Sequence, residues 1–250
     1  MRDLMMTRRR LLVSAGAGVL GVTVLNTVTG CSKSTDPGAV ETPAPGPASS
    51  AGGAVAGGWS RVDLSFVSAY LLIRGSEAAV VDLGTEGSAD AIGAGLAAAG
   101  SGWGAVRHVV LTHKHPDHAG GLAGVEPQVK ATFYTGAADV AEVSATRPLT
   151  PLKDGDEVFG LRIVGTPGHT AGHVAVFDPA TGTLVAGDAL RTTDTLVGPD
   201  PQYTDDMTQA AASVRKLATL DVRTILPGHG APLTSGAAAA LSRLAASLKG

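Results

Sequence analysis

The sequence has little cysteine, few aromatic residues and no excess of basic charge. Cys31 is the only cysteine among 250 residues, which excludes a disulfide within the chain. Aromatic side chains make up 4% of the sequence, so the core must consist mainly of Val, Leu, Ile and Ala. The formal net charge of −3 argues against a nucleic-acid partner, which would need clustered Lys and Arg.

The N-terminal residues 1–31 have the pattern of an export signal. Arg8–Arg10 precede a mildly apolar run from Leu11 to Val28, an arrangement typical of twin-arginine signals. The run ends in Val28-Thr29-Gly30-Cys31, which resembles the processing box of bacterial lipoproteins. We therefore expect lipid attachment at Cys31, with an uncleaved signal anchor as the alternative. Both interpretations place the rest of the chain outside the cytoplasm, anchored to the cell membrane only through its N-terminus.

Residues 32–58 are rich in Pro, Gly, Ala, Ser and Thr and lack the apolar periodicity of a folded segment. We interpret them as a disordered linker. Residues 59–250 are then long enough for one domain with a sizeable core. The sequence thus predicts three parts: a signal segment, a linker and one folded domain.

Within this domain, short apolar stretches alternate with amphipathic ones. Strands come before helices in each half, which predicts two packed sheets with helices on both outer faces. We therefore predict an α/β (α+β) fold arranged as a four-layer αββα sandwich. The expected strands are 62–73 (one or two strands), 78–82, 106–111, 130–134, 158–159, 161–164, 173–178, 183–186 and 222–226, and the expected helices are 88–99, 137–143, 204–220 and 235–248.

The stretch 111–121 carries a dense group of metal-binding side chains. Within six residues lie three histidines and one aspartate: His113, His115, Asp117 and His118. They follow a predicted strand directly, and a loop after a strand is where a rigid scaffold can direct several side chains at one point. A polar loop with solvated histidines is the alternative, but it does not account for the further histidines in later loops.

Three more loops after predicted strands each supply one potential ligand: His169, Asp188 and His229. Zinc prefers imidazole nitrogen and carboxylate oxygen as ligands. Seven donors exceed one tetrahedral site and suit two metal ions about 3.5–4 Å apart, joined by a carboxylate and a hydroxide. We predict two Zn²⁺ ions, with iron or manganese as alternatives. A hydroxide formed there near neutral pH would attack an ester, thioester or amide-like bond of a small-molecule substrate.

Four motifs occur in an order that resembles the metallo-β-lactamase superfamily. They are His-Xaa-His-Xaa-Asp-His (113–118), Pro-Gly-His-Thr (167–170), Gly-Asp (187–188) and Pro-Gly-His-Gly (227–230). The resemblance covers the chain from about Trp59 onward and implies an αββα fold. It also implies an assignment of the metal ligands: one ion on His113, His115 and His169, a second on Asp117, His118 and His229, and Asp188 between them.

The bridging position separates branches of this family. Asp188 stands where class B β-lactamases tend to carry cysteine or serine, so the chain is more similar to the hydroxyacylglutathione hydrolase (glyoxalase II) branch. Lactonases of the superfamily often have a tyrosine three residues later, where this chain has Arg191, a candidate for the substrate pocket. Two alternatives to a hydrolase stay open: a mononuclear-iron enzyme similar to persulfide dioxygenases, and a metal-binding envelope protein without turnover.

Three residues near the motifs are expected to have further roles. Asp117 is expected to orient the nucleophile in addition to binding metal. His173 begins a predicted strand, and we expect it to support the ligands rather than to bind metal. Asp82 ends a predicted strand; it either supports the metal loops, as the resemblance implies, or simply forms a turn.

Overall fold

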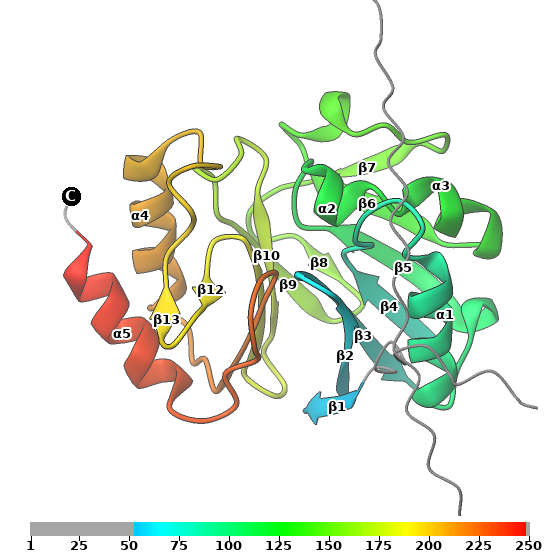
Figure 1. Cartoon of the computed structure of the whole chain (residues 1–250), viewed down its shortest axis with the longest axis horizontal. Coiled ribbons are helices and arrows are strands. Elements are labelled where there is room, and N and C mark those ends of the chain that lie inside the picture. The colour runs from blue at the N-terminus through cyan, green and yellow to red at the C-terminus, as the bar shows by residue number, and fades with distance from the viewer. Residues whose placement is uncertain (1–52, 249–250) are drawn as a thin grey trace, which may run out of the picture. The chain divides into compact units, whose positions relative to one another are not determined.

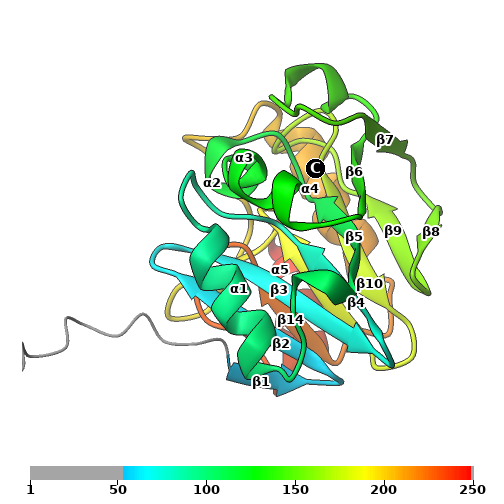
Figure 2. The ribbon, with the colours of Figure 1, turned by 90° about the vertical axis from the view of Figure 1, so that its right-hand side faces the viewer.

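Two β-sheets pack face to face, and helices cover their outer faces (Figures 1 and 2). The structure, a computed structural model, describes residues 53–248. The predicted signal segment, Cys31 and most of the predicted linker lie outside the described residues. None of the helices in the described region is long and apolar enough to cross a lipid bilayer.

The first sheet has seven strands in the order β1-β2-β3-β4-β5-β6-β7. Pairing is antiparallel from β1 to β4 and parallel from β4 to β7. The strands are β1 (Gly53–Ala56), β2 (Trp59–Leu64), β3 (Val67–Arg74), β4 (Glu77–Val81), β5 (Val106–Leu111), β6 (Thr132–Gly136) and β7 (Leu149–Leu152). Three helices lie over its outer face (Figure 2): α1 (Ala89–Ala98), α2 (Pro116–Ala119) and α3 (Leu122–Val125).

The second sheet has five strands in the order β14-β11-β10-β9-β8. The strands are β8 (Glu157–Val158), β9 (Leu161–Gly165), β10 (Val174–Asp178), β11 (Thr183–Gly187) and β14 (Thr224–Pro227). Two helices cover its outer face (Figure 1): α4 (Met207–Leu217) and α5 (Ala237–Ser247). The remaining elements are a two-stranded sheet, β12 (Arg191–Thr192) with β13 (Leu196–Val197), and the 3₁₀ helices η1 (Trp103–Ala105), η2 (Glu126–Gln128) and η3 (Val140–Glu142).

The apolar core has three layers, which strand β3 illustrates. Ala69 and Leu71 on one face of β3 belong to the cluster that includes α1, while Tyr70 and Leu72 on the other face belong to the cluster between the sheets. Side chains alternate along a strand, so a strand between two apolar layers must be apolar at nearly every position. A third cluster joins the second sheet to α4 and α5. The predicted four-layer αββα fold is confirmed.

The folded region begins earlier than we expected. Residues 53–58 were assigned to the linker, but Gly53–Ala56 form β1 and pair with β2. Gly57 and Gly58 make the turn between the two strands with φ of +58° and +82°, a conformation that glycine adopts without steric cost. Because the segment is mostly Ala and Gly, only its pairing partner makes it a strand.

The predicted helix 137–143 is wrong. The structure has turns there and the short 3₁₀ helix η3. The Ala137 amide donates to the Leu152 carbonyl at 3.0 Å, which fixes the start of the segment to the end of β7. The Asp139 carboxylate accepts hydrogen bonds from two other loops, and both ties keep the chain from completing a regular helix.

Candidate metal centre

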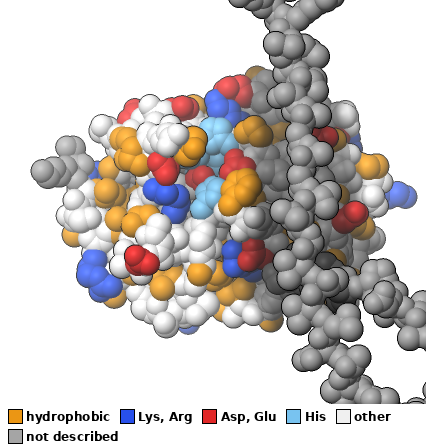
Figure 3. Space-filling model, viewed as in Figure 1, with side chains coloured by type: hydrophobic (Ala, Val, Ile, Leu, Met, Phe, Trp, Pro, Cys, Tyr) orange, Lys and Arg blue, Asp and Glu red, His pale blue; other side chains and the backbone are white. Residues whose placement is uncertain are grey.

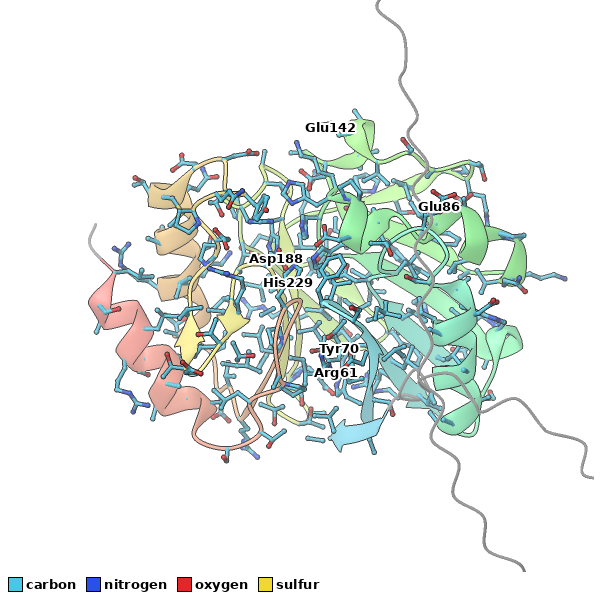
Figure 4. The ribbon with its side chains drawn as sticks, in the orientation of Figure 1. Arg61, Tyr70, Glu86, Glu142, Asp188 and His229 are labelled. Carbon is cyan, nitrogen blue, oxygen red and sulfur yellow. The ribbon has the colours of Figure 1, made fainter. Side chains whose placement is uncertain are left out.

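The loops that follow β5, β9, β11 and β14 meet at one edge of the two sheets and bring together all seven predicted donor residues. Figure 4 shows Asp188 and His229 side by side in the middle of the molecule. The loop after β14 is held by Tyr70 of β3, whose hydroxyl donates to the Pro227 carbonyl at 2.7 Å. The ends of the strands therefore position the donor side chains through contacts within the protein itself.

One group consists of His113, His115 and His169. His115 Nδ1 lies 3.1 Å from His113 Nε2 and 3.0 Å from His169 Nε2. Zinc–nitrogen bonds of about 2.0–2.1 Å in tetrahedral geometry separate ligand nitrogens by about 3.3 Å. Three imidazole nitrogens at this spacing suit one face of a tetrahedral metal site.

A second group consists of Asp117, His118 and His229. His229 Nε2 lies 3.2 Å from Asp117 Oδ2 and 3.5 Å from His118 Nε2. His118 Nε2 lies 3.7 Å from Asp117 Oδ2. These separations again suit three ligands of one small divalent cation.

Asp188 lies between the two groups. Its Oδ2 is 3.4 Å from His169 Nε2 and 3.2 Å from His229 Nε2, and its Oδ1 is 3.1 Å from His118 Nε2. The carboxylate is almost fully buried, yet Oδ1 has no partner with hydrogen-bond geometry among the described residues. A buried carboxylate oxygen needs a partner, and a cation between the two groups would provide one.

The tautomers of four histidines follow from their outer partners. His229 Nδ1 donates to the Phe66 carbonyl at 2.8 Å, and His118 Nδ1 donates to the Asp82 carboxylate at 2.9 Å. His113 Nδ1 lies 3.0 Å from the Thr112 hydroxyl, which itself donates to Asp82. An acceptor at Nδ1 requires a proton there, so the lone pair of each neutral imidazole is on Nε2 and points into the centre.

His169 obeys the same rule. Its Nδ1 lies 3.1 Å from the Thr204 hydroxyl, and that hydroxyl donates to the Asp200 carbonyl at 2.6 Å. Thr204 is therefore free only to accept from His169. Burial lowers the pKa of His169 to about 4, which keeps the ring neutral and its Nε2 available as a ligand.

Asp82 ties together the two ends of the loop that follows β5. Its carboxylate accepts from the Thr112 amide at 2.7 Å and from the Thr112 hydroxyl at 2.9 Å, in addition to His118. Asp82 has a φ of +63°, a conformation that few residues other than glycine, asparagine and aspartate adopt. The contacts favour the supporting role over a simple turn.

His173 directs no nitrogen at either group of ligands. Its Nε2 accepts from the Asp188 amide at 3.0 Å, and its Nδ1 lies 2.7 Å from the Thr166 hydroxyl. Burial lowers its pKa to about 3, so the ring is neutral, as an acceptor must be. His173 thus holds the backbone of Asp188, in line with the supporting role expected for it.

Asp139 was not singled out from the sequence, although it joins two ligand loops. It is fully buried and accepts from the Lys114 amide at 3.0 Å, the Thr170 hydroxyl at 2.7 Å and the Gly172 amide at 2.7 Å. Lys114 stands between the candidate ligands His113 and His115, and Thr170 directly follows the candidate ligand His169. The only sequence signal was an aspartate inside an apolar segment that we assigned to a helix.

Carboxylates around His118 and His229 stabilise positive charge on these two imidazoles. Burial lowers the pKa of His118, but Asp188 and Asp82 outweigh it and raise the pKa well above its ordinary value. Hydrogen bonds to Asp117 and Asp188 raise the pKa of His229 to about 10. Burial raises the pKa of Asp188, but His118 and His229 outweigh it and hold the pKa well below its usual range. A divalent cation would compete with protons for these same imidazoles.

The centre opens into a cavity of about 550 Å³. Figure 3 shows histidine and acidic side chains in a hollow of this face, with hydrophobic side chains on both sides. The lining includes Asp117 and His229 of the second group, the aromatic residues Phe66 and Tyr203, and Arg191. Arg191 thus lies where the sequence placed it, while Phe66 and Tyr203 were not anticipated.

Replacing Gly228 by alanine should disturb the second group of ligands. A Cβ atom there would lie 2.4 Å from Asp188 Oδ1 and 2.7 Å from His118 Cε1. We expect Gly228→Ala to weaken Zn²⁺ binding at the second group by about 10–100-fold, as loss of ligand support does elsewhere. Competition with a coloured chelator measures this. Gly104→Ala, which meets nothing within 4 Å, is the control, and equal affinities in the two variants would contradict the prediction.

Comparison with known protein families and curated proteins gives a consistent picture. The model of the family described as "Metallo-beta-lactamase superfamily" matches residues 62–229. "Probable metallo-hydrolase YflN" of Bacillus subtilis is 29% identical over 174 residues, covering 52% of this chain and 66% of the relative. Hydroxyacylglutathione hydrolase of Acidiphilium cryptum is 34% identical over 169 residues, covering 64% and 63%. The chain spans about half to two thirds of the length of the curated relatives it matches.

Solved structures share the fold. The metallo-beta-lactamase family protein TTHA1429 of Thermus thermophilus superposes with a TM-score of 0.62 at 27% identity, covering 76% of this chain and 78% of that protein. The protein TTHA1623, solved in a di-iron-bound form, gives a TM-score of 0.58 at 25% identity, covering 72% and 92%. Iron thus occurs in a protein of this fold.

Proposed function

The chain belongs to the metallo-β-lactamase superfamily, and we propose that it is a hydrolase with two Zn²⁺ ions that cleaves an ester, thioester or amide-like bond of a small molecule. Relatives named as metallo-hydrolase, hydroxyacylglutathione hydrolase and thioesterase support hydrolysis at this general level. Asp188 at the bridging position favours the glyoxalase II-like branch.

One observation carries the proposal. Four imidazoles have their outer nitrogen bonded to a group that accepts there, so their Nε2 atoms converge on Asp188. Nε2 atoms that converge in this way need protons or a cation among them, because their lone pairs would otherwise repel one another. Three donors near one centre and three near the other, joined by a carboxylate, are the ligand sets of a two-metal hydrolytic site.

Metal ions bound there would supply a hydroxide near neutral pH and a Lewis acid for the carbonyl oxygen. The residues of the chain have separate tasks. Asp117 is a ligand candidate that is also partly exposed to the cavity, so its carboxylate can accept a hydrogen bond from the nucleophile and orient it. The buried partners Asp82, Asp139 and His173 hold the ligands in place and keep them from turning toward solvent.

The metal content and the substrates turned over test the proposal together. The purified whole protein should contain two zinc ions per chain and should hydrolyse at least one of a thioester, a lactone, a β-lactam and an aryl ester. Removal of the metal by a chelator should abolish turnover, and Zn²⁺ should restore it. One iron per chain together with oxygen consumption on a persulfide would overturn the hydrolase in favour of a dioxygenase. Two zinc ions without turnover of any substrate would favour a metal-binding protein.

A further inference from the structure

We infer that the cavity selects substrates whose bound part is uncharged and apolar and discriminates against anionic ones. The inference rests on the proposed hydrolase and names its substrate class: uncharged esters, lactones or amides with an alkyl or aryl group. It differs from the charged thioester implied by the name of the hydroxyacylglutathione hydrolases, because glutathione carries two carboxylates and one ammonium group.

The apolar part of the argument comes from two aromatic side chains. The described residues contain three exposed large hydrophobic side chains, and two of them, Phe66 and Tyr203, line the cavity at 59% and 60% exposure. Exposed aromatic side chains beside a cavity mark a binding surface for apolar groups. Phe66 lies in the turn between β2 and β3, and its ring stacks on His229 with centroids 6.1 Å apart.

The charge part of the argument comes from Arg191. Among the residues that line the cavity, Arg191 is the only lysine or arginine. Its Nη1 lies 2.9 Å from Asp200 Oδ2, and its Nε donates to the Gly198 carbonyl at 3.2 Å. Asp200 lines the same cavity and is itself held by the Gln202 amide at 3.0 Å. The single basic charge is therefore neutralised within the cavity.

A substrate carboxylate near Arg191 would also approach Asp200, and the like charges would repel each other. The other acids of the cavity, Asp117 and Asp188, are candidate metal ligands, and bound cations would offset their charge. Away from the centre, the charge that a substrate meets is therefore set by Arg191 and Asp200. An uncharged group avoids this repulsion and gains contact with the aromatic walls. The loop that carries Asp200 also positions Thr204, whose hydroxyl donates to the Asp200 carbonyl and contacts His169. The segment 200–204 therefore contributes both to the charge of the cavity and to the orientation of His169.

A matched pair of substrates tests the inference in the whole Zn²⁺-loaded protein. The para-nitrophenyl ester of hexanoate and the mono-para-nitrophenyl ester of adipate differ only in a terminal methyl or carboxylate. We expect kcat/KM to be at least about tenfold higher for hexanoate. Asp200→Asn, which releases Arg191, should raise the adipate-to-hexanoate ratio about tenfold. Asp221→Asn, which removes an exposed partner of Arg223, should leave the ratio at the wild-type value.

Binding separates this inference from the hydrolase itself. Calorimetry with the anilide of hexanoate and the mono-anilide of adipate measures selectivity even where neither ester is turned over. Tighter binding of the uncharged anilide without turnover would support the inference and contradict the hydrolase. Turnover with a preference for adipate, or an unchanged ratio in Asp200→Asn, would overturn the inference and leave the hydrolase in place.

Discussion

Replacing Asp188 by alanine should lower kcat/KM by about 1,000-fold or more and remove metal from both groups of ligands. Asp188 is the donor whose oxygens lie within 3.4 Å of His169 on one side and of His118 and His229 on the other. Without Asp188, both groups lose the carboxylate that they share. The His118 and His229 side also loses a negative charge that stabilises a bound cation. Asp188→Asn keeps the shape and removes only the charge, so it separates the two effects.

Metal content and activity are measured on the same preparations. Inductively coupled plasma mass spectrometry gives the metal per chain, and steady-state kinetics gives kcat/KM. Asp221→Ala is the control, because that carboxylate is 81% exposed and pairs with Arg223 at the surface. If the Asp188→Ala variant retained two metal ions and most of its activity, the assignment of Asp188 as a metal ligand would be contradicted.

The second large effect is expected at Asp139. Asp139→Ala leaves the Lys114 amide, the Thr170 hydroxyl and the Gly172 amide without their acceptor in the interior. An unsatisfied buried donor costs about 1–3 kcal/mol, so the free energy of unfolding should fall by about 3 kcal/mol or more. Because Asp139 joins the loops that carry His113, His115 and His169, one metal ion should also bind about 10–100-fold more weakly.

A second buried aspartate provides a matched control for Asp139. Asp178 is also fully buried and accepts from Trp59, Arg74, Ala180 and Thr181, but none of these residues lies in a loop that carries a candidate metal ligand. Denaturant unfolding should show a loss of stability in both alanine variants, and a two-site Zn²⁺ titration should show weaker binding only in Asp139→Ala. Equal metal affinities in the two variants would mean that Asp139 has only a structural role.

Much of the candidate centre was predictable because its donor residues lie in short sequence motifs. Three histidines and an aspartate within six residues, followed by three more donors after predicted strands, indicated a shared metal site. The strands themselves are buried on both faces, so their nearly continuous apolar runs were also predictable. Strand β1 and the segment 137–143 were not, since pairing with β2 and hydrogen bonds from distant loops decide their conformation.

The sequence by itself determined which side chains can bind metal, their order along the chain, and the layers of the fold. It also predicts export and lipid attachment at Cys31, which stay predictions. Only the tertiary structure decided which atom of each ligand faces the centre. His229 is oriented by the carbonyl of Phe66, 163 residues away in sequence, and His169 by Thr204, 35 residues away. A backbone carbonyl is present in every residue, so its use as a partner leaves no trace in the sequence. The pairing of Arg191 with Asp200 likewise depends on how one loop folds, and that pairing sets the charge that a substrate meets.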